Sequence, residues 1–509
     1  MEKERWFNNR PICLIFLFLM LGSVFAFYLS STPEIALIVF SIVFFAVFLL
    51  FLKINKIKTL VLIFLAFVIG AGAYNLTTYN FYKNEIVTPS QITARISTVG
   101  KANDSYLYIE ADSVKLDGKE INSNIVIYLY DTDSLYSGIE IGRKITFSPN
   151  SFYQNDLYKY ETPQASLITS NLKYTASANM GKVTLGDVDK TFAETIKQKI
   201  KENLKNGLSN ENVEIAYSSL FGEKELLSDS QYSAYKLSGV AHLLAVSGLH
   251  VGIIVGILNF FLKRIKYRKW IKLVAIAPFL LFYMYICNFA FSIIRATIMF
   301  IMLLISDSIG TEYDSLCSIS IAGIVIYCIN PLCVFDISFL MSFMCVLGIA
   351  MFNKPINKML SYIKCPKALS SSISLSLSST ISLLFIMAFY FQNLNVISIL
   401  ANIILIPIFT IAFVVIFIIS IIALILPFIS QFIVYLLYPL NYIFDFVNII
   451  ATALGNLSIS NFNTLSFNYI AILIYFMLLL IMGRFCTAKY KYRVAATLPI
   501  VTLLFYCLI

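Results

Sequence analysis

Histidine and charged side chains are scarce in this sequence. Only two of its 509 residues are histidine, and Asp, Glu, Lys and Arg together make up 13%. Two histidines are too few for a dinuclear, histidine-rich metal centre, and no G-x-x-x-x-G-K-S/T phosphate-binding loop is present. These absences exclude a metallohydrolase with a histidine-rich dinuclear centre and an ATPase that uses such a phosphate-binding loop. We expect no enzymatic activity and no bound metal or cofactor.

Cysteine is absent from the one long polar region, residues 77–186. The nine cysteines lie elsewhere, and most of them fall in apolar runs, where cysteine acts as a small hydrophobic side chain. No two of them have the spacing of a metal site. We therefore expect no obligatory disulfide in the polar region.

Long apolar runs, by contrast, are abundant. Hydrophobic residues make up 59% of the chain, and runs of about 18 or more apolar residues recur. The pattern predicts an α-helical polytopic membrane protein with about 13 transmembrane helices. The first run, Ile12–Tyr28, follows a basic start but lacks a clear small-x-small cleavage site, so we expect a retained helix rather than a signal peptide.

The expected spans form two blocks, residues 1–76 and residues 241–509. Their expected bounds are 12–29, 35–52, 60–75, 241–262, 271–288, 291–305, 318–330, 337–352, 370–391, 408–426, 430–453, 467–485 and 494–509. A further stretch, Val396–Pro407, is too short to cross alone. We expect it to be re-entrant, with Asn402 and Pro407 shaping its turn.

Basic residues predict the orientation. Lys53, Lys56 and Lys58 lie between the second and third spans, whereas the link between the first and second carries no Lys or Arg. Because cytoplasmic links carry an excess of these residues, the amino terminus is expected in the cytoplasm of a multi-pass plasma-membrane protein. The third span then leads outside, so residues 77–186 are expected to be extracytoplasmic.

The polar region has the alternation of β-strands. Segments such as ITARISTV and SNIVIYLYD alternate apolar and polar residues, and Asp117-Gly118 marks a turn. Several short strands in about 100 residues predict a small all-β domain, with an OB-like barrel favoured. Tyrosines at 106, 108, 128 and 130 would suit stacking on single-stranded bases. Acidic residues slightly outnumber basic ones in this region, however, so a structural cap over the membrane part stays the alternative.

Residues 187–240 read as connector helices. In Asp187–Lys205 the apolar residues Phe192, Ile196 and Ile200 recur every four positions, which predicts an amphipathic helix. A second helix is expected over Val213–Phe221.

Both histidines lie in one short segment, Gly239–Gly252, that is otherwise small or apolar apart from one serine. Polar side chains inside a membrane are costly, so His242, Ser247 and His250 are candidates for a functional site. The alternative is that they only bond neighbouring helices. Ser247 and His250 are three residues apart and share a helix face.

Glycines follow in the same segment. Gly248, Gly252 and Gly256 form one stripe on a helix, which we interpret as close helix packing. The Ser247-Gly248 pair is also a point at which the helix can break and expose backbone groups to a cavity.

Three further charged residues lie in or beside the expected spans. Arg295 is the deepest basic residue, and it either contacts phosphate or pairs with an intramembrane acid such as Asp445. Asp336 is expected near an interface, where it caps a helix.

Five segments, in order, resemble the ComEC-type competence family, the inner-membrane DNA-uptake channels of transformable bacteria. They are FGEKELLS (Phe221–Ser228), HLLAVSGLHVG (His242–Gly252), SIIRATIM (Ser292–Met299), NPLCVFDISFLMSF (Asn330–Phe343) and ISILANIILIP (Ile397–Pro407). Ser342 lies in the fourth segment, where Leu340 stands in place of the glutamine that the family leads us to expect. The family also carries an extracellular OB-like domain where this chain has its polar region.

The resemblance implies a plasma-membrane channel, residues 241–509, for uptake of single-stranded DNA during natural transformation. The implied partners are single-stranded DNA, membrane lipids, a DNA receptor, a separate nuclease and a cytoplasmic helicase, and an oligomer is compatible with it. Many members end in a metallo-β-lactamase-like nuclease domain. This chain is too poor in histidine for that domain and ends within an apolar run, so we expect the nuclease to be absent from it.

Other classes share the same composition. A transporter of another solute or of lipid would also place polar residues in membrane helices, and a homologue that has lost its function would keep the motifs. An intramembrane serine hydrolase would use Ser247 with His250. That reading is disfavoured because both residues lie on one helix and no oxyanion donor is evident.

Overall fold

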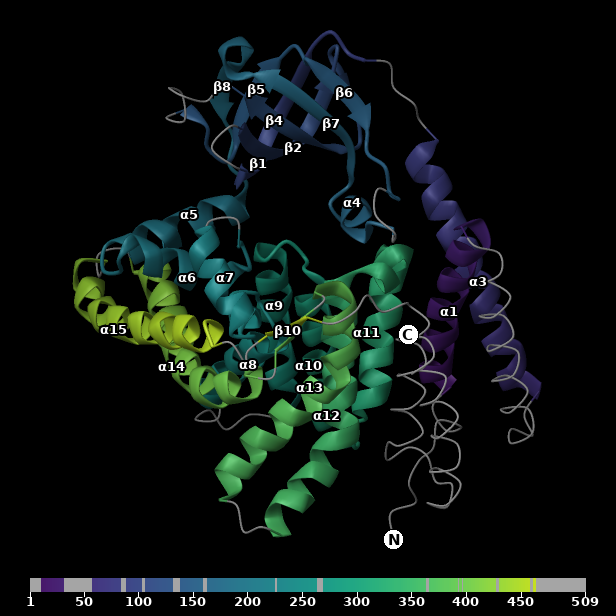
Figure 1. Ribbon diagram of the computed structural model, residues 1–509, viewed down its shortest axis with the longest axis vertical. Coiled ribbons are helices and arrows are strands. Elements are labelled where there is room, and N and C mark those ends of the chain that lie inside the picture. Colours follow the sequence, from purple (N-terminus) through teal and green to yellow (C-terminus); the bar gives the residue numbers. More distant parts are fainter. Residues whose placement is uncertain are drawn as a thin grey trace. The chain divides into compact units, whose positions relative to one another are not determined.

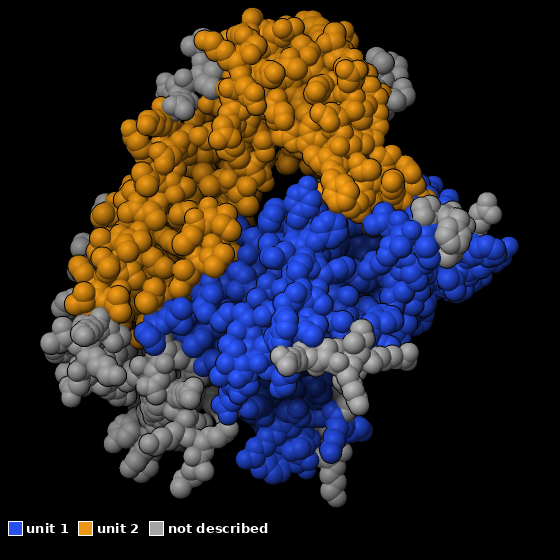
Figure 2. All heavy atoms as spheres, turned by 180° about the vertical axis from the view of Figure 1, so that it is seen from behind, with its two compact units in different colours: residues 1–13, 203–322, 337–509 blue, residues 14–202, 323–336 orange. Residues whose placement is uncertain are grey.

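The computed structural model of the chain describes residues 11–31, 57–83, 88–102, 106–130, 138–158, 163–224, 227–262, 269–362, 366–391, 393–395, 397–426, 430–457 and 461–463. The spans expected at 35–52, 467–485 and 494–509 lie outside these residues. The chain divides into two compact units, coloured in Figure 2: unit 1 comprises residues 1–13, 203–322 and 337–509, and unit 2 comprises residues 14–202 and 323–336. The whole polar region therefore falls in unit 2.

Unit 2 contains a β-sheet of eight strands (Figure 1). The strands are β1 (Ile92–Ala102), β2 (Tyr106–Leu116), β3 (Lys119–Glu120), β4 (Asn124–Tyr130), β5 (Arg143–Phe147), β6 (Ser151–Gln154), β7 (Leu172–Asn179) and β8 (Thr184–Val188). Their order is β6-β7-β4-β2-β1-β5-β8, with β3 beside β2, and only the β4–β7 pair is parallel. The expected β domain is confirmed. Its closure into an OB-like barrel stays a prediction.

Alternation along the strands builds the core of this sheet. Ile92, Ala94 and Ile96 of β1 are buried on one side and pack with apolar residues of β2, β4, β5 and β7. The turn after β2 is the one that the sequence marks: Asp117 and Gly118 both have positive φ, 48° and 81°. A two-residue hairpin turn of this kind needs left-handed backbone at both positions, which Asp tolerates and Gly favours.

Helices α1 (Pro11–Ser31), α3 (Ile57–Tyr82), α4 (Ala165–Thr169) and η5 (Pro331–Phe335) complete most of unit 2. The helices expected at 12–29 and 60–75 are confirmed. Gly22 of α1 and Gly70 of α3 each lie against the backbone of the other helix, at Phe67 and Leu19 respectively, so a side chain at either glycine would collide with a carbonyl oxygen. Small residues allow this approach of two membrane-type helices.

In its described residues, unit 1 is helical apart from a two-stranded sheet (Figure 1). Its elements are α6 (Asn210–Phe221), α7 (Asp229–Leu237), η4 (Ala241–Leu243), α8 (Gly248–Leu262), α9 (Lys269–Ile286), α10 (Phe291–Ile309), α11 (Ser315–Ile329, whose end belongs to unit 2), α12 (Ile337–Tyr362), α13 (Lys367–Phe391), β9 (Asn393–Asn395), α14 (Ser398–Ile425), α15 (Ser430–Gly455) and β10 (Asn461–Asn463). The amphipathic helix α5 (Phe192–Lys205) crosses from unit 2 into unit 1.

Seven described helices are long and apolar enough to cross a membrane. They are Pro11–Ser30, Val61–Tyr82, Lys269–Ile286, Phe291–Ile309, Ile337–Tyr362, Ser398–Ile425 and Phe432–Gly455. Shorter apolar helices occupy Gly248–Leu262, Ser315–Ile329 and Leu369–Leu384. The protein is therefore a mostly helical protein of the membrane type with a separate β domain, and the total of about 13 spans stays a prediction.

Two expectations about helix boundaries are corrected. The re-entrant turn at Val396–Pro407 is wrong, because α14 runs without a break from Ser398 to Ile425 with Pro407 inside it. Membrane helices tolerate an internal proline when neighbouring groups satisfy the freed carbonyl. The span expected at 241–262 is two pieces, η4 and α8, with α8 beginning at Gly248. The chain thus breaks at the Ser-Gly pair, as the sequence allows.

Candidate functional site

The start of α8 holds the polar residues of the motif. The imidazole Nδ1 of His250 accepts a hydrogen bond from the backbone N–H of Ser247 at 3.0 Å and lies 3.2 Å from the Ser247 hydroxyl. The first turn of a helix leaves its backbone N–H groups without intrahelical acceptors, and the His250 ring provides an acceptor at this end of α8. Because Nδ1 accepts, a neutral ring carries its proton at Nε2. That Nε2 is buried, and no described group bonds to it.

His250 is enclosed by aromatic rings. Its side chain is 1% exposed, and its ring centroid lies 4.4 Å from that of Phe413 and 6.4 Å from that of Phe409, both on α14. His242, on η4, is exposed instead. The two histidines therefore lie in different environments in this conformation: His250 is buried against the rings of α14, whereas His242 is exposed.

Arg295 of α10 lies beside the same turn. A Cβ added to Gly248 would come 2.9 Å from Nη2 of Arg295, so the absence of a side chain lets the guanidinium approach α8. Nη1 of Arg295 donates to the backbone carbonyl of Ser342 on α12. Arg295 is buried, and its Nε has no partner among the described residues. Ser247, Gly248, His250, Arg295 and Ser342 thus form one cluster, which we call the α8 cluster.

The glycine stripe is partly a packing surface, as interpreted. A Cβ on Gly252 would lie 3.3 Å from the Phe300 ring of α10, whereas a Cβ on Gly256 would meet nothing within 4 Å. Two of the three glycines therefore face α10, and the third faces open space.

Asp445 is not the partner of Arg295. Its Oδ1 accepts from Nδ2 of Asn212 on α6 at 2.8 Å, and Asn441, one turn earlier on α15, bonds to Asn212 and to the backbone of Ser209. The suggested Arg295–Asp445 ion pair is therefore wrong. These side chains instead attach the connector helix α6 to α15.

This second polar cluster, on α15, was not predicted from the sequence. Asn441, Asp445 and Asn448 recur at i, i+4 and i+7 along an apolar helix, and Asn448 accepts from the Tyr235 hydroxyl of α7 at 2.8 Å. That spacing places all three on one face. The pattern was therefore a readable signal for a polar face that binds the connector helices.

The remaining candidates lie apart from the α8 cluster. Nδ2 of Asn402 donates to Ser376 of α13 over 3.5 Å, while its Oδ1 is buried and has no partner in the described ranges. Pro407 is an exposed residue of α14. Asp336 follows η5 directly and is the C-cap residue of that helix, where its backbone N–H bonds to the Cys333 carbonyl; the side-chain cap expected of it stays a prediction. No hydrogen bond or ion pair joins any of the three to Arg295 in the described structure.

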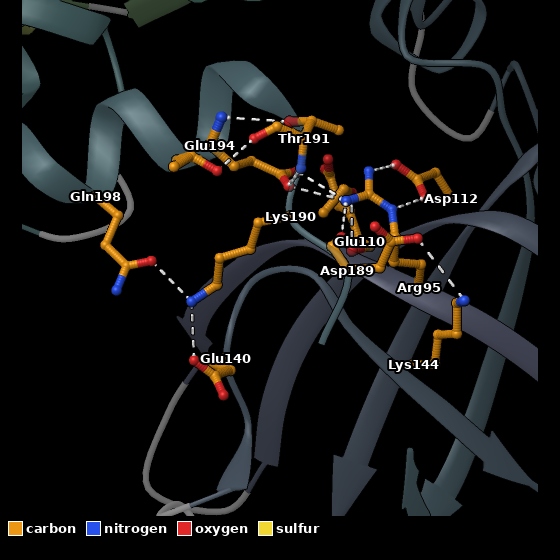
Figure 3. Close-up of polar contacts among 12 residues, drawn as sticks. Arg95, Glu110, Asp112, Glu140, Lys144, Asp189, Lys190, Thr191, Glu194 and Gln198 are labelled. Atoms are coloured by element: carbon orange, nitrogen blue, oxygen red, sulfur yellow. Dashed lines mark hydrogen bonds and ion pairs between the residues drawn. The ribbon is translucent and has the colours of Figure 1, made fainter. Parts of the chain in front are cut away.

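The β domain of unit 2 carries its own charged cluster, drawn in Figure 3. Nε of Arg95 donates to Asp112 Oδ1 at 2.8 Å, and Nη1 donates to Glu194 Oε2 at 2.9 Å. Glu194 also accepts from the backbone N–H of Thr191, whose hydroxyl accepts from the N–H of Glu194. This reciprocal capping box begins α5. Arg95 therefore joins the sheet to the start of the amphipathic helix.

A more exposed ion network lies beside it (Figure 3). Lys190 bonds to Glu140, as the figure shows, and Arg143 bonds to the same carboxylate. The hydrogen bonds from these two side chains, Lys190 first, and then their positive charges lower the pKa of the Glu140 carboxyl below its ordinary value.

The tyrosines proposed for base stacking contact one another. The ring centroids of Tyr106 and Tyr128 are 5.4 Å apart, and Tyr108 lies 5.8 Å from Tyr128. The Tyr108 hydroxyl donates to Glu110. The tyrosine rings therefore pack against one another, but one of them also bonds to the Glu110 carboxylate. Base stacking and a structural cap both stay open as roles for this domain.

These features define a class: a helical protein of the membrane type with a separate β domain and a buried arginine beside the start of a broken helix. Comparison with known proteins narrows the class. Residues 219–508 match the family described as "Competence protein". The chain belongs to this competence family, and the resemblance deduced from its five motifs is confirmed.

Two curated relatives match parts of the chain. ComE operon protein 3 of Bacillus subtilis is 27% identical over 193 residues, and Recombination protein 2 of Haemophilus influenzae is 30% identical over 169 residues. The matches cover 37% and 31% of this chain but only 24% and 21% of the relatives' lengths. No solved structure matches the chain.

Proposed function

We propose that this protein imports DNA across the plasma membrane during natural transformation, passing a single strand through unit 1. The observation that carries the proposal is the family match over residues 219–508, which contains the α8 cluster with its buried Arg295. A strand is a row of phosphate charges, and it needs a hydrated, protein-lined path. A buried arginine without a described carboxylate suits that cargo better than it suits a neutral solute.

In this proposal the structure represents a closed state. Phe413 and Phe409 of α14 cover His250, so passage requires α14 to move away from α8. The membrane potential opposes anion import by about 2.3 kcal/mol per charge per 100 mV. Because the sequence lacks a phosphate-binding loop, a cytoplasmic helicase or single-strand-binding protein supplies the pull.

The finer features belong to the same proposal. The β domain is an extracytoplasmic, OB-like domain, the amino terminus is cytoplasmic, and about 13 helices cross the membrane. A DNA receptor delivers the duplex and a separate nuclease degrades one strand. The chain itself performs no chemistry.

The test is uptake of labelled DNA in a strain that lacks the gene. We expect nuclease-resistant label in the cytoplasm to disappear while surface-bound label persists, and the intact gene to restore it. Unchanged cytoplasmic label in the deletion strain would reject the proposal.

One contact favours a second candidate, an intramembrane serine hydrolase. The Ser247 hydroxyl lies 3.2 Å from Nδ1 of His250, within reach of a general base. Against it, Nδ1 already accepts from the Ser247 backbone N–H, and no described third group orients the ring at Nε2. Peptide hydrolysis by the purified protein that disappears in Ser247→Ala would establish this candidate.

A further inference from the structure

Arg295 is a buried cation whose counter-ion the described chain does not supply. The residue is 6% exposed. Its Nη1 reaches only the Ser342 carbonyl, and its Nε is buried with no partner in the described ranges. A guanidinium carries five N–H donors, and a buried charge without a counter-ion is strongly unfavourable.

The first turn of α8 adds positive potential at the same place. Gly248 begins this 15-residue helix, so the backbone N–H groups of its first turn lack intrahelical acceptors, and the helix dipole is positive at this end. Nη2 of Arg295 lies 2.9 Å from where a Gly248 Cβ would be. The guanidinium of Arg295 and the positive end of α8 therefore lie close together, and an anion bound between them would stabilise this arrangement.

The turn is reachable from the surface of unit 1. Ser247 and Gly248 are partly exposed, and the Leu249 side chain is 40% exposed. Arg295 lies directly behind Gly248. An anion that approaches the first turn meets backbone amides first and the guanidinium next.

We propose that the first turn of α8 and Arg295 together bind one phosphodiester or phosphate group. Backbone amides at a helix start and a guanidinium are both complementary to phosphate oxygens. On binding, Arg295 exchanges the Ser342 carbonyl for the anion. This inference rests on the proposed function, in which the anion belongs to a DNA strand, although a lipid headgroup carries the same phosphodiester.

The test is calorimetric titration of the full chain in a phosphate-free detergent. The probes are the dinucleotide thymidylyl-thymidine, which has a single phosphodiester, its neutral methylphosphonate analogue, and a soluble short-chain phosphatidylglycerol. We expect the dinucleotide to bind about tenfold or more tightly than the neutral analogue, since hydrogen bonds to charged groups are the strong ones. Equal binding of the two would overturn the site.

Variants assign the binding to these residues. Arg295→Gln is expected to lower dinucleotide affinity about tenfold or more, and Arg295→Lys to keep part of it, because lysine retains the charge but not the forked donors. Gly248→Ala is expected to weaken binding, since the new Cβ lies between the turn and the guanidinium. Gly256→Ala is the matched control. It makes the same change on the same helix, in open space, and is expected to bind normally.

The outcomes separate the site from the function. Arg295→Lys and Gly248→Ala are the mildest changes, and they serve as the test if Arg295→Gln does not fold. Normal dinucleotide affinity in both of these variants would overturn the site and leave the uptake proposal standing. Binding of phosphatidylglycerol but not of dinucleotide would replace the strand by a lipid. Loss of dinucleotide binding in the variants, with normal DNA uptake in the deletion strain, would keep the site and reject the proposed function.

Discussion

Replacing Arg95 with methionine is expected to destabilise the β domain by about 3 kcal/mol. Arg95 is buried and pairs with Asp112 and Glu194, whose side chains are 25% and 16% exposed. Removing one partner of a buried ion pair costs about 3–5 kcal/mol, because the remaining charge is left uncompensated. Partial exposure of both carboxylates places the loss at the lower end of that range. Methionine keeps much of the apolar volume, so a cavity adds little.

Lys144→Met is the matched control on the neighbouring strand. Nζ of Lys144 lies 3.8 Å from Asp189, and the two side chains are 50% and 70% exposed. Exposed pairs of this kind contribute about 0–1 kcal/mol. The two substitutions therefore remove a cation from the same sheet at very different burial.

Hydrogen exchange of the full chain in detergent, followed by mass spectrometry, measures the difference. A loss of about 3 kcal/mol corresponds to exchange roughly 100-fold faster for amides that open with the domain. We expect this in peptides of β1, β2 and α5 for Arg95→Met and little change for Lys144→Met. The double variant Arg95→Met/Glu194→Gln is expected to lose less than the sum of its single changes, because the two side chains interact. Equal protection in Arg95→Met and Lys144→Met would refute the buried ion network.

Three further outcomes follow from local geometry. Gly256→Ala is expected to raise the free energy of unfolding by up to about 1 kcal/mol, since its Cβ meets nothing. Gly248→Ala is expected to lower the free energy of unfolding, because its Cβ meets the Arg295 guanidinium. Equal shifts of the melting temperature for the two variants in one detergent would contradict this packing. Phe413→Ala is expected to cost about 3–5 kcal/mol by opening a cavity beside His250, and a loss below about 1 kcal/mol in denaturant titration would show that this ring is not packed. The pKa of Glu140 is lowered in the folded protein. The ionised Glu140 therefore stabilises the fold fully above the ordinary glutamate pKa of about 4.3, and this stabilisation is lost as the pH falls through the lower pKa of the folded state. Unfolding curves from pH 5 downward should therefore lose this pH dependence in Glu140→Gln, and identical slopes would count against the network.

Local pattern was enough to predict the helices and the β domain. Apolar runs located α9, α10, α12, α13 and α15 within a few residues at their starts, because length and hydropathy are properties of one segment. Alternation and the Asp117-Gly118 turn located the strands for the same reason. Each of these features is decided by neighbours in sequence.

Features that depend on distant segments were not predictable. In the sequence, Pro407 predicts the end of a helix, yet α14 continues through it. Groups on neighbouring helices decide whether the carbonyl freed by a proline is satisfied, and the sequence around Pro407 does not show those groups. The sequence shows Arg295 and Asp445 as two intramembrane charges, but only the fold reveals that Asn212 takes the acid. His250 is sealed by rings from α14, a contact that no local pattern encodes.

The central claim is that the buried Arg295 handles a DNA strand within unit 1. It is tested most directly by cytoplasmic import of labelled DNA in cells whose sole copy of the gene carries Arg295→Gln, with Gly256→Ala cells as the control and membrane levels of the protein matched. We predict that import falls about tenfold or more in the first strain, with surface-bound DNA unchanged, and is normal in the second. Normal import with Arg295→Gln would contradict the account.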